Sequence, residues 1–147
     1  MKPQNEMDMS FESRSSNEAF ARCAVAAFLT QLDPTVSELN DIKTAVSEAV
    51  TNCVVHAYRD TIGKVYINVK IEENSLITIK IRDKGCGIEN IKRAMEPLFT
   101  TASSDERAGL GFAVMESFTD KLKVSSKIGK GTTVTFQKRL SCRVGNG

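Results

Sequence analysis

The sequence of 147 residues predicts an α/β fold, a two-layer sandwich in which a mixed, mainly antiparallel sheet carries helices on one face. Two segments with helical spacing of apolar residues occupy the first part of the chain. Two pairs of segments that alternate between apolar and polar residues follow, each pair joined by a short polar turn. A further helical segment lies between the two pairs. Elements in this order favour one sheet with its helices packed on one side.

The first elements of the chain are expected to be an edge strand and two helices. The segment "MDMSFES", residues 7–13, alternates weakly and fits a strand, and residues 16–32 have helical spacing. Pro34 ends that helix because proline cannot continue it, and a second helix is expected over residues 37–57. The apolar face of the first helix is expected to consist of Phe20, Ala24, Ala27 and Phe28.

The rest of the chain is expected to form two hairpins around a loop and a helix. The strands "KVYINVKI" and "LITIKI" are joined by "EENS", and the strands "KLKVSSK" and "TTVTFQKRL" by "IGKG". Between the hairpins we expect a short helix at 88–94, an irregular polar loop at 96–108 and a helix at 109–119. Residues 1–140 are therefore expected to form one domain, followed by a disordered tail at 141–147.

The composition is that of an ordinary soluble domain and argues against several classes of protein. The 20 Lys and Arg residues nearly balance the 18 Asp and Glu residues, so the net charge of +2 gives no electrostatic basis for binding nucleic acid or a membrane surface. The longest apolar stretch, "AVAAFLTQL", is too short to span a bilayer, and the N-terminus lacks the apolar core of a signal peptide. We therefore expect a cytoplasmic protein. Its four scattered cysteines and one histidine do not have the spacing of a zinc site.

A polar stripe runs along the second predicted helix. In "VSEAVTNCVVHAY", Glu48, Asn52 and His56 follow one another at steps of four, which places them on nearly one side of a helix. A solvated helix face is the ordinary explanation of such a stripe. Asparagine is a poor helix former, however, and its side-chain oxygen is a suitable ligand for Mg²⁺. Glu48 lies one turn away from Asn52 and can serve as a general base.

The second candidate site is "DKGCGI", which begins at Asp83 where a predicted strand ends. An aspartate followed by glycines is typical of a tight turn. Gly85 and Gly87 also permit a flat ligand to approach the backbone, and Asp83 can then accept a hydrogen bond from an amino group such as that of adenine. Cys86 lies between the two glycines and is expected to be an inert thiol, although exposure next to a ligand would make it reactive.

The third candidate site is "RAGLGF", which begins at Arg107. Its glycines precede a predicted helix, so free backbone N–H groups can face a phosphate, and Arg107 adds a charge-assisted contact. A GxG motif alone is a weak signal. No GK[ST] follows, which excludes the Walker A pattern, and the spacing does not fit a dinucleotide-binding motif.

Taken together, these segments are more specific than any one of them. The stretches "EAVTNCVVHAY", "DKGCGI", "GLGF" and "GKGTTVTF" resemble the N-box, the DxGxG box, the second glycine box and the closing strand of the ATP-binding domain shared by DNA gyrase, Hsp90, histidine kinases and MutL. The resemblance implies a Bergerat-type ATP-binding fold. With "PLFTT" and "FESRSSNEAFAR" added, the chain is most similar to the bacterial anti-sigma serine kinases, and among these to the anti-sigma F factors of sporulating bacilli. The stress-response anti-sigma kinases resemble it almost as closely.

The resemblance implies a role for each motif, with ATP as substrate, ADP as product and Mg²⁺ as metal. Glu48 would be the catalytic base that deprotonates a serine of a partner protein, Asn52 would bind Mg²⁺, and Asp83 would read the adenine amino group. The adenine pocket would include Gly85, Gly87 and Thr133. The phosphates and the lid above them, at 97–108, would involve Thr100, Thr101, Arg107, Gly109, Leu110 and Gly111. Such a site suits phosphoryl transfer, which depends on positioning and charge neutralisation.

The resemblance also implies protein partners. A kinase of this type holds an RNA polymerase sigma factor away from the polymerase, and it phosphorylates a serine of the anti-anti-sigma protein that attacks this complex. It acts as a homodimer and binds neither nucleic acid nor a membrane directly. The first helix, with Arg14 and Arg22 on its surface, is an expected docking region.

Other interpretations of the same motifs remain open. An isolated histidine-kinase ATPase domain would need a phosphoacceptor histidine, but none precedes the polar stripe, and His56 is expected to be structural. A gyrase-like or Hsp90-like ATPase would need further domains. A sigma-binding module with ATP as a structural ligand would need no catalysis, and Glu48 is the residue that discriminates it from a kinase.

Overall fold

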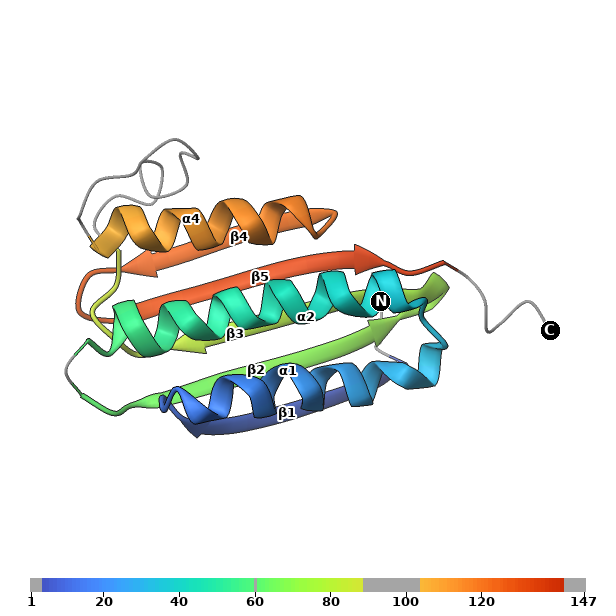
Figure 1. The fold of residues 1–147 in the computed structure, drawn as a ribbon, viewed down its shortest axis with the longest axis horizontal. Coiled ribbons are helices and arrows are strands. Elements are labelled where there is room, and N and C mark those ends of the chain that lie inside the picture. The colour runs from blue at the N-terminus through green and yellow to red at the C-terminus, as the bar shows by residue number, and fades with distance from the viewer. Residues whose placement is uncertain (1–3, 60, 89–103, 142–147) are drawn as a thin grey trace.

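The structure, a computed structural model, describes residues 4–59, 61–88 and 104–141, with the backbone alone for residues 104–110. The strands of the described chain are β1 (Asn5–Glu12), β2 (Lys64–Glu72), β3 (Leu76–Asp83), β4 (Lys121–Lys127) and β5 (Gly131–Arg139) (Figure 1). Its α-helices are α1 (Ser16–Leu29), α2 (Val36–Thr51) and α4 (Ser104–Ser117). Shorter helical segments are Thr30–Leu32, the π-helical segment Asn52–Ala57 and Glu73–Ser75.

The strands form one sheet in the order β1-β2-β3-β5-β4. Each neighbouring pair is antiparallel, and β1 is an edge strand, as expected. The sequence predicts a mixed sheet, whereas the described strands contain no parallel pair. The reason is the position of β5: it lies between β3 and β4, which run in the same direction, and so keeps them from pairing with each other (Figure 1).

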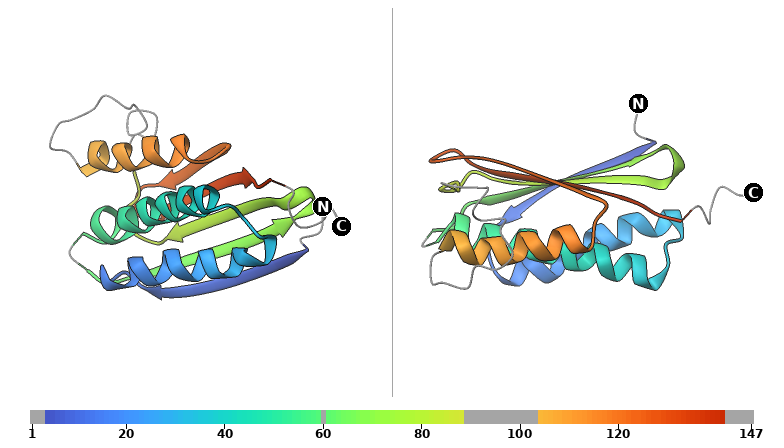
Figure 2. Two further views of the ribbon diagram at one scale, coloured as in Figure 1. Left: turned by 45° about the vertical axis from the view of Figure 1, so that its right-hand side comes forward. Right: turned by 90° about the horizontal axis from the view of Figure 1, so that it is seen from above.

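The α-helices of the described chain lie on one face of the sheet, which confirms the two-layer sandwich (Figure 2). The core between the layers uses alternate residues of β2 and β3, since successive side chains of a strand point to opposite faces. These side chains are 0–2% exposed: Val65, Ile67, Val69, Ile71, Ile77, Ile79 and Ile81. Removing this apolar surface from water is the main force that holds the helices on the sheet.

The buried face of α1 differs from the expected one. The side chains that it buries are Ala21, Val25, Ala26 and Leu29. Phe20, expected in the core, is 56% exposed and contacts Phe11 edge to face at a ring distance of 6.3 Å. Both stripes repeat at steps of four, so spacing alone does not distinguish them. Ala21, Val25 and Leu29 belong to the core that α2 and the sheet share, and Phe28 of the expected stripe is partly buried against it, whereas Phe20 lies outside.

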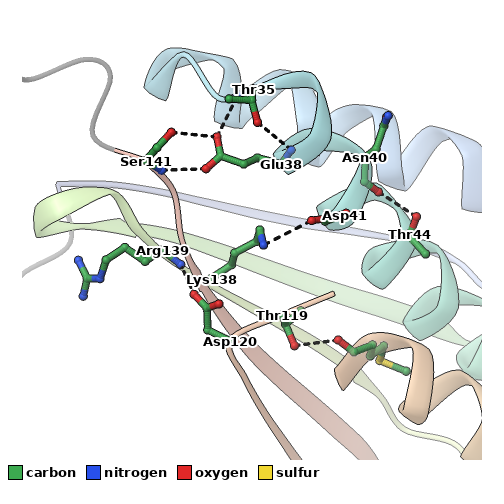
Figure 3. A network of polar contacts seen from close by, with 11 residues as sticks. Thr35, Glu38, Asn40, Asp41, Thr44, Thr119, Asp120, Lys138, Arg139 and Ser141 are labelled. Carbon is green, nitrogen blue, oxygen red and sulfur yellow. Dashed lines mark hydrogen bonds and ion pairs between the residues drawn. The ribbon is translucent and has the colours of Figure 1, made fainter. Parts of the chain in front are cut away.

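The start of α2 is fixed by a network of polar contacts around Glu38 (Figure 3). Thr35 and Glu38 form a capping box, in which the Thr35 hydroxyl accepts from the Glu38 N–H at 3.0 Å and the Glu38 carboxylate accepts from the Thr35 N–H at 2.8 Å. The same carboxylate accepts from the N–H of Ser141 at 2.8 Å. The first residue of the expected tail is therefore bonded to a helix end.

Helix α4 begins earlier than the sequence suggests. The expected irregular loop ended at residue 108, but the backbone is helical from Ser104 to Ser117. That expectation rested on the polar and irregular sequence of residues 96–108. The expected helix at 88–94 and the loop up to residue 103 lie almost wholly outside the described residues. Within the described part of the chain, no helix has the length and apolarity needed to cross a membrane.

Candidate functional site

The three predicted motifs meet at one small cavity on the helical side of the sheet. Its walls include Asn52 from the π-helical segment, Asp83 from the end of β3 and Gly87 from the turn that follows. Phe112 of α4 and Thr132 of β5 complete it. The volume of the cavity between the described residues is about 30 Å³.

A wider hollow of about 680 Å³ lies elsewhere, on the open face of the sheet. It is lined by polar residues of β1, β2 and β3, including Asp8, Lys70 and Lys80. Among the predicted site residues that the structure describes with side chains, it contains only Thr133. The chemistry that the motifs predict is therefore concentrated at the smaller cavity.

The polar stripe of the second helix faces another helix and not only solvent. Glu48, Asn52 and His56 are half-buried. A Cβ atom built on Gly111 of α4 would lie 3.1 Å from Asn52 Oδ1 and 3.2 Å from Glu48 Oε2. The glycine thus leaves room for both polar side chains, which brings the N-box-like and GLGF motifs into contact.

The helix that carries the stripe changes its winding at Asn52. The α-helix ends at Thr51, and residues 52–57 are π-helical, with the Tyr58 N–H bonded to the Cys53 carbonyl at 3.1 Å. Segments of this kind occur mostly as single turns and often at functional sites. Asn52 and His56 both line the cavity, although the widened winding means that they are no longer separated by one regular α-helical turn.

Asp83 is a buried carboxylate, 5% exposed, with donors on both oxygens. Its Oδ1 accepts from the N–H groups of Gly85 at 2.9 Å and Thr132 at 3.2 Å. Its Oδ2 lies 3.5 Å from Cys53 Sγ, which donates to it. Burial raises the pKa of the Asp83 carboxyl, and the three hydrogen bonds offset part of that rise. A carboxylate held this way can act as a fixed acceptor in a site with little water.

The glycines of the DxGxG-like turn have a reason in the packing of the protein itself. A Cβ on Gly85 would lie 2.4 Å from the Ala57 carbonyl oxygen, and a Cβ on Gly87 would lie 2.4 Å from that of Lys127. Gly87 also has a φ of +79°, which favours glycine. The Cys86 N–H donates to the same Ala57 carbonyl at 3.1 Å. Close backbone packing therefore explains these glycines without a ligand.

The structure replaces Thr133 by its neighbour as a candidate site residue. Thr132 lines the cavity and donates its N–H to Asp83, whereas Thr133 lines the hollow on the opposite face of the sheet. The alternation of β5 gives the reason, because Val134 and Phe136 are buried on the same side as Thr132. That pattern was available in the sequence and would have identified the correct threonine.

Cys53 is a second residue of the cavity that the motifs did not single out. It follows Asn52 directly and is 4% exposed. Nothing in the sequence indicates its contact with Asp83, a residue thirty positions away.

Several predicted phosphate contacts have no side-chain description. Thr100 and Thr101 lie outside the described residues, and for Arg107, Gly109 and Leu110 the structure gives only a helical backbone. The expectation that the glycines precede a helix is wrong. Gly109 and Gly111 lie inside α4, where N–H groups bond within the helix, and the free N–H groups of such a helix are those of its first turn.

Comparison with known proteins agrees with this combination of fold and motifs. The chain matches the family described as Histidine kinase-like ATPase domain over residues 11–138. It is 55% identical over 140 residues to the Anti-sigma F factor of Caldanaerobacter subterraneus subsp. tengcongensis, which covers 95% of this chain and 97% of that protein. It is 54% identical over 138 residues to the Anti-sigma F factor of Clostridium beijerinckii, with 93% and 96% covered.

Two solved structures are similar in fold. The RsbU and RsbW domains of Rv1364c from Mycobacterium tuberculosis align with a TM-score of 0.68 and 18% identity, over 94% of this chain and 32% of that chain. The histidine kinase domain of the blue-light activated histidine kinase from Erythrobacter litoralis EL346 aligns with a TM-score of 0.57 and 20% identity, over 84% of this chain and 60% of that chain. At these identities the likeness concerns the fold alone.

Proposed function

Because the chain belongs to the family of histidine kinase-like ATPase domains, and within it to the anti-sigma F factors, we propose that it is an anti-sigma factor that binds Mg-ATP and phosphorylates a serine of its anti-anti-sigma antagonist. The observation that carries the proposal is the convergence of Glu48, Asn52 and Gly111 beside the cavity that contains Asp83. Phosphoryl transfer needs positioning and charge neutralisation more than covalent help from the protein. These groups would provide the positioning, and the Mg²⁺ that Asn52 would hold would neutralise the charge.

Asp83 supports adenine binding at one end of the site. Its oxygens are fixed acceptors in a mostly apolar cavity, which suits an exocyclic amino group. Thr132 holds the carboxylate from the β5 side, and Gly87 forms part of the wall. A purine that carries an oxo group at the same position would present no donor to Asp83.

Asn52 supports a magnesium ion that arrives with the nucleotide. The described residues contain no group of three or more His, Cys, Asp or Glu side chains that can hold a metal by themselves. Mg²⁺ commonly takes one or two protein oxygens and completes its shell with phosphates and water, so a single asparagine oxygen fits. The bound ion would neutralise phosphate charge.

Glu48 supports the transfer step as the general base. It lies on the same helix as Asn52, and both side chains are next to Gly111. A carboxylate in this position can accept the proton of a serine hydroxyl as the hydroxyl attacks the terminal phosphate. The products are then ADP and a phosphoserine on the partner.

The proposed partners are a sigma factor of the sporulation F type and its anti-anti-sigma antagonist, with the kinase as a homodimer. The names of the relatives support the first partner. On α1, Glu18 bonds to Arg22 at 2.7 Å and also accepts from the Ser47 hydroxyl of α2. Arg22, one of the two arginines expected for docking, is thus held in an ion pair on the surface of α1, and we propose this helix as the docking region. A stress-response sigma factor is the alternative partner.

The test is mass spectrometry of a reaction that contains the chain, Mg-ATP and candidate antagonists of both the sporulation and the stress-response type. We expect one phosphate on a serine of the sporulation-type antagonist. Phosphate on the stress-response antagonist would assign the chain to the stress-response pathway, and the proposed kinase activity would still stand. ATP binding without transfer to either would leave a nucleotide-gated sigma-binding module.

A further inference from the structure

A hydrogen bond from the Cys53 thiol links the N-box-like helix to Asp83 of the DxGxG-like turn. Cys53 follows Asn52 in the π-helical segment and lines the same cavity. Its Sγ lies 3.5 Å from Asp83 Oδ2, a normal distance for a hydrogen bond that involves sulfur. The thiol is buried, so this contact is shielded from water.

The hydrogen bonds of Asp83 leave a limited number of acceptor positions. A carboxylate has about four lone-pair sites, two on each oxygen. Oδ1 accepts two backbone N–H groups, from Gly85 and Thr132. Oδ2 accepts the thiol of Cys53. Counting the described residues alone, one acceptor position remains on Oδ2.

The orientation of that remaining position depends on the thiol. The terminal torsion of an aspartate side chain is broad, so the carboxylate plane is set by its partners. Two of them hold Oδ1, but only Cys53 is seen to hold Oδ2 in the described contacts. A protonated cysteine thiol is a donor, although a weak one.

We propose that Cys53 is a positioning residue for purine recognition: its thiol holds Oδ2 of Asp83 so that the remaining lone pair faces the amino group of adenine. The inference rests on the proposed binding of ATP and adds a determinant of base selectivity to it. Loss of the donor lets the carboxylate rotate, which weakens ATP binding. ITP, which has an oxo group in place of the amino group, gains nothing from the orientation and is affected less.

Several other charged and titratable groups near Asp83 have contacts with residues other than Asp83. The Tyr58 hydroxyl accepts from the Lys84 N–H at 2.6 Å and donates to the Lys64 carbonyl at 2.7 Å. The side chains of Arg82 and Lys84 lie over the ring of Tyr66. Further ionisable groups that line hollows shared with Asp83 are His56, Lys127 and Lys130.

The loss of the thiol also predicts a shift in pH dependence. The ionised form of Asp83 is the better acceptor, so ATP affinity falls as the pH falls through the pKa of this carboxyl. The Cys53 hydrogen bond lowers that pKa against the effect of burial. A variant without a donor at position 53 should therefore lose ATP at a higher pH than the parent chain. ATP itself also gains a proton in this pH range. Dividing the ATP affinity of the variant by that of the parent chain at each pH removes this effect.

The experiment compares ATP and ITP titrations, between pH 5 and 8, for the parent chain and three variants of the full chain. Cys53→Ala removes the donor and some volume. Cys53→Val removes the donor but fills the space with an apolar side chain, and Cys53→Ser keeps a donor. Cys23→Ala is the matched control, because Cys23 is an exposed thiol on α1. The ratio of the affinity for ATP to the affinity for ITP is measured within each variant, so it does not depend on the fraction of the protein that is folded.

We expect both the alanine and valine variants to lower the ratio of ATP affinity to ITP affinity about threefold, which is the effect of losing one weak hydrogen bond. Both should also move the acid limb of ATP binding to higher pH, whereas the serine variant keeps the parent profile. Equal ratios and equal profiles in all variants would overturn the inference while ATP binding by the parent chain still stands. The inference would also be overturned if the valine variant bound ATP like the parent chain and the serine variant did not. Cys53 would then act through packing and not through its hydrogen bond. A parent chain that binds no ATP would instead remove the proposed function itself.

Discussion

Gly111 lies so close to Asn52 that a Cβ atom at the glycine would be 3.1 Å from the asparagine Oδ1. Two helices that are about sixty residues apart in the chain therefore share the position where the metal ligand is proposed. At such a distance an added methyl group forces its neighbour to shift by a few tenths of an ångström. The contact makes Gly111 a sensitive probe of the site.

We predict that Gly111→Ala separates stability from nucleotide binding. Alanine is the better helix former, by up to about 1 kcal/mol, so the melting temperature should stay level or rise. The added Cβ displaces Asn52 and Glu48, and Mg-ATP affinity should fall about tenfold, or ~1.4 kcal/mol. Calorimetric titration and thermal unfolding of the same preparation measure both effects. Unchanged affinity would show that Asn52 does not need its present position.

A second prediction separates the metal ligand from the base. Glu48→Gln should keep Mg-ATP binding and lose phosphotransfer by about a hundredfold or more, the usual contribution of a general base. Asn52→Ala should weaken Mg-ATP binding itself, because it removes a ligand of the ion. Nucleotide titration and a phosphotransfer assay distinguish the two variants. Phosphotransfer that survives intact in Glu48→Gln would remove the proposed base.

Asp83→Asn is expected to stabilise the chain and to abolish adenine recognition. The pKa of Asp83 is raised by burial, so the folded state binds a proton more readily than the unfolded state. Stability from this group is then present at low pH and is lost as the pH rises through the folded pKa. At neutral pH the amide should raise the melting temperature by about 2–4 °C. Its N–H groups would meet the adenine amino group, and ATP affinity should fall at least about tenfold.

The control for that variant is the pH profile of unfolding. The parent chain and Asp83→Asn should converge in stability below the pKa of the carboxyl, where the parent residue is protonated. A gap of constant size from pH 3 to 8 would assign the gain to some other change.

The carboxylate of Glu38 should contribute stability with the opposite dependence on pH. Burial raises the pKa of this group, but the hydrogen bonds from Thr35 and Ser141 together lower it below the ordinary value of 4.5. The stability that it provides is therefore present above the unfolded pKa and is lost as the pH falls through the folded one. Glu38→Ala removes the capping box, at a cost of about 1 kcal/mol, and should lower the melting temperature at pH 7.

Thermal unfolding at pH 7 and at pH 3 tests this prediction. The effect of Glu38→Ala should shrink at pH 3, where the parent carboxyl is protonated. Ser141→Ala is the milder comparison, because it removes a hydroxyl contact of 3.4 Å and leaves the backbone N–H in place. An equal loss at both pH values would assign the effect to helix propensity alone.

The sequence was sufficient for the architecture because its patterns are local. The alternation from Val65 to Ile81 defined two buried strands, and Pro34 separated the first two helices. It was insufficient where two local patterns are equivalent. Phe20 and Ala21 belong to stripes with the same period, and only the packing of α1 against α2 decides between them.

The candidate site shows the same division. The motifs identified Asn52, Asp83 and Gly87, which lie at one cavity. The one-residue error at Thr133 and the omission of Cys53 concern which neighbour points inwards, which depends on contacts between distant segments. The contact of Gly111 with Asn52 and Glu48 was likewise not predicted, because it joins two helices that are distant in the chain.

The π-helical segment has a consequence for how this part of the chain tolerates changes in length. A π-helical turn contains one residue more than the α-helical turn that it replaces. Each residue of an α-helix advances the chain by about 100° around the helix axis. A single deletion between Asn52 and Ala57 would restore regular winding, and it would rotate the Ala57 carbonyl away from Gly85 and Cys86, which it contacts now. Point substitutions here change one side chain, whereas a deletion would separate the turn that carries Asp83 from the helix that carries Asn52.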